Sequence, residues 1–115
     1  MQDAFRHQHF TKILEQFSER LDGLLLEIRR FEQPSLISAE LLDELASTLG
    51  ELMLVLIGHK NSNGGSSYAG RTASDARHLR EVLRLGAPPT NQITDAIHSL
   101  LKELSTLIHE DKQAA

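Results

Sequence analysis

The chain has 115 residues, enough for one hydrophobic core and one domain. Hydrophobic residues make up 40% of it and cysteine is absent, which excludes a disordered tail, a disulfide framework and a thiolate metal site. The net charge of −4 argues against non-specific nucleic-acid binding. The charged N-terminus and the lack of a long apolar run predict a cytoplasmic protein that makes no membrane contact.

The first predicted helix spans about residues 3–32. Its large apolar residues recur four and three positions apart, which is the heptad spacing of a helix packed along one face. They are Phe10, Leu14, Phe17, Leu21, Leu24, Ile28 and Phe31. Pro34 favours the end of the helix, because the residue before a proline disfavours helical geometry.

The second predicted helix spans about residues 36–57, with Ser35 or Ser38 as its N-cap and Gly58 as the residue that ends it. Its interior Gly50 suggests the close approach of a neighbouring helix. The last turns are apolar on every side, which predicts burial on every side. Together with one leucine that lies off the apolar face of the first helix, they give the candidate partner-binding or dimer interface: Leu26, Met53, Leu54, Val55 and Ile57.

Residues 59–71 are rich in glycine, serine and asparagine and predict a flexible surface loop. Thr72 is the predicted N-cap of a third helix over 73–85, which ends at Gly86. Thr90 is the predicted N-cap of a fourth helix over about 91–112. The fourth helix repeats the heptad spacing through Ile93, Ile97, Leu100, Leu104 and Leu107.

These elements predict an all-α fold. Residues 1–115 form a single four-helix bundle-like domain with a long first helix and a short third helix. Because the first helix is longer than its neighbours and stays apolar to its end, a second copy of the chain is its expected cover. An intertwined homodimer is therefore predicted.

Charge is segregated along the chain. Residues 34–58 carry four acids and no base, and residues 59–90 carry five bases and two acids. Arg77, Arg80 and Arg84 share one face of the third helix. This face is either solvated, with its arginines free or paired with the acids of the second helix within the molecule or across a dimer, or it is a site for an acidic partner or an anion.

No sequence pattern indicates catalysis. The metal-binding patterns His-Glu-x-x-His and Glu-x-x-His do not occur in the sequence. The Gly-x-Ser-x-Gly turn that carries a serine nucleophile does not occur either. The sequence therefore predicts a protein that is not an enzyme, with no catalytic, cofactor-binding or metal-ligating residues.

The function predicted from a helical surface with spare apolar side chains is a small protein-binding regulator. It would act on an unidentified protein by occupying its surface, as an antiactivator, anti-sigma-like factor, immunity protein or antitoxin does. Small dimeric antiactivators of bacterial transcription factors are similar in size and helix content. Two alternatives are a subunit or chaperone of a larger assembly and a nucleic-acid accessory protein that uses Arg71, Arg77, Arg80 and Arg84.

Overall fold

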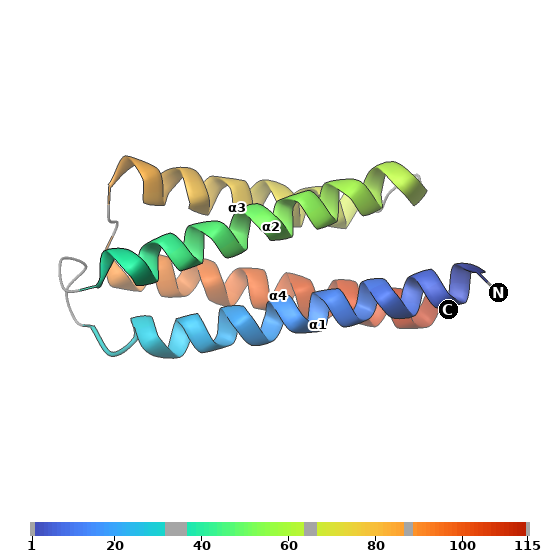
Figure 1. The fold of residues 1–115 in the computed structure, drawn as a ribbon, viewed down its shortest axis with the longest axis horizontal. Helices are drawn as coiled ribbons and strands as arrows, with labels where there is room; N and C mark the ends of the chain where they lie inside the picture. The colour runs from blue at the N-terminus through green and yellow to red at the C-terminus, as the bar shows by residue number, and fades with distance from the viewer. Residues whose placement is uncertain (1, 32–36, 64–66, 87–88, 115) are drawn as a thin grey trace.

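The computed structural model describes the backbone of residues 2–31, 37–63, 67–86 and 89–114, and the side chains of 9–31, 37–58, 69–86 and 89–110. Over these residues the chain forms four helices and no strand, which confirms the predicted all-α class (Figure 1). The helices are α1 (Gln2–Ile28), α2 (Ala39–Asn63), α3 (Ser67–Leu85) and α4 (Thr90–Ala114).

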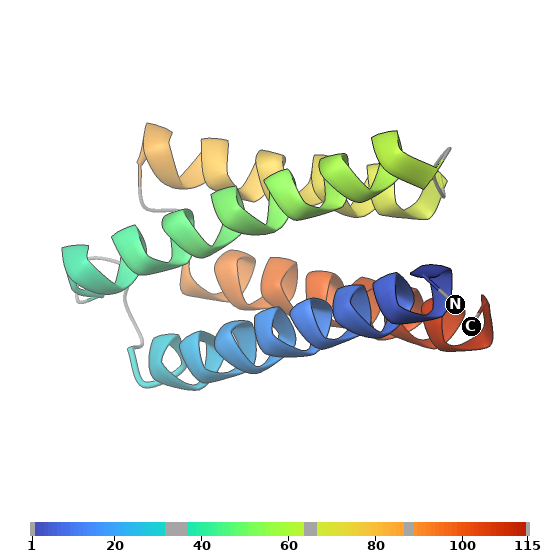
Figure 2. The ribbon, with the colours of Figure 1, turned by 45° about the vertical axis from the view of Figure 1, so that its right-hand side comes forward.

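The helices run alternately up and down and stack as two antiparallel pairs. α2 lies beside α3, and α1 lies beside α4, as Figures 1 and 2 show from two directions. Contact within each pair is more extensive than contact between the pairs, where α1 meets α2 and α3 meets α4. The result is an elongated bundle of 49 × 22 × 19 Å.

The core consists mainly of leucine and isoleucine side chains from α1, α2 and α4, with Phe10 and Phe17 of α1. The predicted heptad positions are buried from Phe10 to Ile28 in α1 and from Ile93 to Leu107 in α4. The buried face of α3 differs, because it is built mainly from small residues. This face consists of Ala69, Thr72, Ala73, Ala76 and Leu79. Small side chains let α2 and α3 pack closely.

The first helix is shorter than predicted. It ends at Ile28 rather than near residue 32, and the backbone then tightens: the N–H groups of Arg30 and Phe31 donate to carbonyls three residues earlier, at 3.2 and 3.0 Å. α1 therefore has 27 residues against 25 in each of α2 and α4. The excess length on which the dimer prediction partly depended is only two residues.

The predicted loop over 59–71 is also wrong in its extent. α2 continues through Gly58 to Asn63 and α3 begins at Ser67, so only 64–66 remain between them, outside the described residues. Gly58 thus lies inside α2, and Thr72 lies buried inside α3 instead of capping it. Packing of the small residues of α3 against α2 outweighs the weak helix propensity of this segment.

Two predicted helix ends are confirmed and one is displaced. Ser38 caps α2: its Oγ accepts the N–H of Leu41 at 3.1 Å. Gly86 ends α3 with a φ of 154°, which residues with a side chain rarely adopt. At the start of α4 it is the carbonyl of Pro89, not the hydroxyl of Thr90, that accepts the first helical N–H groups. Ser35, the other candidate cap, lies outside the described residues.

Candidate protein-interaction surface

One line of residues along α2 faces away from the core. This line has its own four-three spacing, opposite the fully buried leucines at 45, 49, 52 and 56. We call it the α2 strip, and it comprises Asp43, Ser47, Gly50, Leu54 and Ile57. Its second half is apolar and open to solvent, with Leu54 73% and Ile57 42% exposed. Exposed large apolar side chains next to grooves are typical of docking surfaces.

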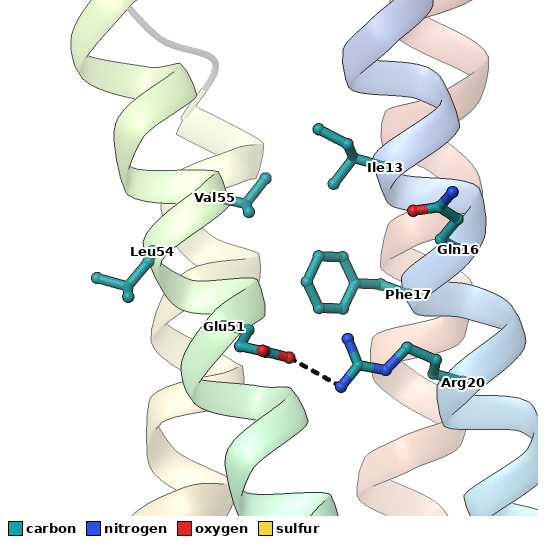
Figure 3. A pocket seen from close by; sticks show the side chains of 7 residues that line it. All are labelled: Ile13, Gln16, Phe17, Arg20, Glu51, Leu54 and Val55. Atoms are coloured by element: carbon teal, nitrogen blue, oxygen red, sulfur yellow. Dashed lines mark ion pairs between the residues drawn. The ribbon is translucent and has the colours of Figure 1, made fainter.

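A groove of about 440 Å³ lies between α1 and α2 on one side of the strip. Its walls are mostly apolar: Ile13 and Phe17 of α1 and Val55 of α2 point into the same space, whereas Leu54 points away from α1 (Figure 3). We call it the α1/α2 groove. It follows the boundary between the two helix pairs, where packing is less extensive.

One end of the α1/α2 groove is held by Arg20. Its guanidinium pairs with Glu51 at 2.8 Å and donates to the Thr48 hydroxyl at 3.0 Å (Figure 3). Arg20 also lies over the Phe17 ring, 5.3 Å from its centroid. Because Arg20 and Glu51 are about half exposed, the ion pair adds little stability, but it positions the wall that Phe17 forms.

A second groove, of about 510 Å³, lies on the other side of the strip, between α2 and α3. Small residues line it on α2, at Ala46, Ser47 and Gly50. Arg80 and Arg84 line it on α3. We call it the α2/α3 groove. A Cβ at Gly50 would lie 3.6 Å from the Nε atom of Arg80, an ordinary contact with a flexible side chain, so the close helix approach predicted there is not found.

Replacing Gly50 by alanine should raise the free energy of unfolding by roughly 0.5–1 kcal/mol, because glycine inside a helix is unfavourable relative to alanine. The nearest atoms to the new methyl group, 3.6 and 3.7 Å away, belong to a flexible arginine, so the methyl group fits. Urea denaturation measures the change. Gly23→Ala on α1, which has nothing within 4 Å, is the control. A loss of stability at Gly50 with a gain at Gly23 would contradict the prediction.

The arginines of α3 do not share one environment. Arg77 and Arg84 are exposed and Arg80 is half-buried beside Gly50. Arg84 pairs with Glu81 of its own helix at 3.7 Å. Among the described residues of one chain no ion pair links α3 to the acids of α2, so the pairing predicted within the molecule is not formed. The groups that line the α2/α3 groove therefore remain open to an acidic partner.

Arg71 lies near α4, with its Nε atom 4.0 Å from Glu103. Four arginines were candidates for nucleic-acid contact. Arg71 faces α4 while Arg80 and Arg84 face α2, so the set does not form one continuous phosphate-binding surface.

The structure gathers most of the predicted interface residues around the α2 strip. Met53 lines the α2/α3 groove, Val55 lines the α1/α2 groove, and Leu54 lines both. Leu26 is 56% exposed on α1 but lines neither groove. Sequence reasoning missed Ile13, whose only signal was its place directly before a heptad position.

A buried carboxyl group on α4 was also missed. Glu103 lies between α4 and α3, near Arg71, and hydrogen-bonds to the Asp75 carboxyl group. Burial, and then the hydrogen bond to Asp75 and its negative charge, raise the pKa of Glu103 from an ordinary 4.5 to about 7, against the lowering effect of Arg71. No hydrogen-bond partner among the described residues reaches its Oε2 atom.

Other kinds of site find no support in the described part of the chain. No group of three histidine, aspartate or glutamate side chains there is arranged to hold a metal ion. None of its helices has the length and apolar character needed to cross a membrane. Comparison with protein-family models, curated proteins and solved structures finds no match.

Proposed function

We propose that the chain is a small non-catalytic regulator that binds another protein and acts by occupying that protein's surface, as an antiactivator, immunity protein or antitoxin does. The observation that carries the proposal is the α1/α2 groove, an apolar depression open to solvent in a small bundle. Apolar grooves between helices suit an amphipathic helix of another protein.

The groove suggests what the partner helix contributes. Ile13 and Phe17 are one helical turn apart on α1, and Val55 faces them from α2. Apolar side chains one turn apart on a partner helix would fit between these walls. Arg20, held at one end by its ion pair with Glu51, offers a cation to the polar edge of that helix.

A homodimer is the second part of the proposal. The length of α1 does not support it, because α1 has no long apolar end that a second copy must cover. The exposure of Leu54 and Ile57 does support it. In this arrangement one face of the bundle serves self-association and the α1/α2 groove serves the regulated protein.

The test is partner capture from cells of the native source, with tagged wild type, Ile13→Glu and Leu85→Glu. A charge at Ile13 would be placed in the apolar wall and should abolish stoichiometric capture. Leu85, 87% exposed and outside both grooves, is the matched control and should retain it. Circular dichroism establishes that each variant is folded, and Ile13→Ala, which should weaken capture, covers the case in which Ile13→Glu does not fold.

The captured protein must then lose its activity when the purified chain is added in a one-to-one ratio. A stoichiometric partner held equally well by Ile13→Glu would contradict the groove assignment. The absence of any partner, or a partner whose activity is unchanged, would contradict the regulator.

A further inference from the structure

The geometry points to a second copy of this chain as the occupant of the α2/α3 groove. The two copies pack α2 against α2, side by side and in the same direction, about a two-fold axis parallel to the helices. This contact deepens the homodimer part of the proposed function, and it leaves the Ile13, Phe17 and Val55 walls of the α1/α2 groove to the regulated protein. Spacing, side-chain size and charge each support it.

The α2 strip has the spacing of a coiled-coil contact. Its members recur four, three, four and three residues apart, so they stay on one line along a neighbouring helix. In a parallel two-fold pair each strip residue meets its own counterpart. Leu54 and Ile57 would then form two apolar layers, and Gly50 and Ser47 would let the helices approach closely.

The two sides of the strip carry opposite charges. Helix spacing places Glu44 and Glu51, both exposed, on the side of the strip toward α1, although Glu51 also borders the α2/α3 groove. On the side toward α3 lie Arg80 and Arg84. A two-fold axis parallel to the helices places the acidic side of each copy against the basic side of the other. An antiparallel pair would instead place acid against acid and arginine against arginine. Charge therefore selects the parallel arrangement.

The charges also match in height along the helix. Arg80 lies beside Gly50, level with Glu51. α3 runs opposite to α2, so Arg84 lies one turn nearer the start of α2, beside Ala46 and Ser47 and toward Glu44. The acids of each copy would thus make two contacts with arginines of the other, beside the Ser47 and Gly50 positions of the strip.

Because one helix from each copy makes most of the contact, we expect a dissociation constant of about micromolar order. Two Asp43 side chains meet at the end of the strip and oppose tighter binding. Sedimentation equilibrium should show 12.8 kDa monomers in exchange with dimers, and Leu54→Glu should raise the dissociation constant at least tenfold. Leu85→Glu is the control and should leave it unchanged.

The relative direction of the two α2 helices is tested with single introduced cysteines, since the chain has no cysteine of its own. Leu54→Cys and Asp43→Cys, eleven residues apart on the strip, should each form a disulfide-linked dimer under mild oxidation. In an antiparallel pair a residue meets its own counterpart only at the two-fold axis. Such a pair would therefore form a disulfide at no more than one of these two positions. Leu85→Cys, off the strip, should not link.

Charge pairing is tested by reversal. Glu51→Lys and Arg80→Glu should each weaken dimerisation about tenfold. An equimolar mixture of the two variants should restore it, because the mixed dimer again has acid facing base at both contacts. Loss of the internal Arg20–Glu51 pair does not explain such a restoration, since mixing leaves each chain unchanged.

A chain that stays monomeric, or links at Leu54→Cys but not at Asp43→Cys, would overturn this inference, as would a mixture no tighter than the single variants. None of these results affects partner capture through Ile13, so the groove assignment is judged separately. Conversely, a parallel dimer without a regulated partner would support this contact and contradict the proposed regulator.

Discussion

Between about pH 4.5 and pH 7 the free energy of unfolding should fall, by an amount on the order of 3 kcal/mol, through the neighbouring carboxyl groups of Glu103 and Asp75, and then level off. Folding raises the pKa of the Glu103 carboxyl group from 4.5 to about 7. In that window the unfolded chain releases the proton while the folded chain keeps it, so stability falls as pH rises. The full effect is present below pH 4.5 and lost above pH 7.

Glu103→Gln should remove most of this slope. A glutamine keeps the shape of the neutral acid and still donates a hydrogen bond toward Asp75. Urea denaturation at pH 4.5 and pH 8 should show near-equal stability at the lower pH and a more stable variant at the higher pH. Glu27→Gln, exposed on α1, is the control for general charge effects. A difference between Glu103→Gln and wild type that does not change with pH would contradict a neutral Glu103 in the folded protein.

Ala76→Leu should lower the free energy of unfolding by about 1–3 kcal/mol, because a larger side chain in a filled core forces its neighbours apart. Ala76 is fully buried on the small-residue face of α3, where that helix packs against the rest of the bundle. The matched control is Ser74→Leu, two residues away and exposed. Urea denaturation measures both variants, and equal effects would mean that the small residues of α3 are not required for close packing.

The fold class could be predicted because the apolar spacing of α1 and α4 is long and regular. Phe10 to Ile28 and Ile93 to Leu107 fall where the heptads predict, since large apolar side chains must be buried wherever the helices cross. The prediction of a loop over 59–71 failed for the opposite reason. The helical start of α3 depends on buried small residues such as Ala69 and Ala73, whose contribution is visible only once α3 packs against α2.

The candidate surface could be predicted only in part. Leu54 was identifiable because it interrupts the polar side of α2, but the grooves beside it depend on how far α1 and α3 lie from α2. Glu103 was hidden because it directly precedes the heptad residue Leu104, where a charged side chain usually reaches solvent. Its burial follows from the position of α3.

The stacking of α1 on α4 means that the first and last helices of the chain are neighbours, with both termini at the same end of the bundle (Figures 1 and 2). The α2–α3 pair is joined by residues 64–66 alone, so it closes with a small loss of chain entropy. The α1–α4 pair closes only when both ends of the chain come together. Folding should therefore start from the α2–α3 pair and finish with the α1–α4 pair. The pair that should form last contains α1, which provides one wall of the α1/α2 groove.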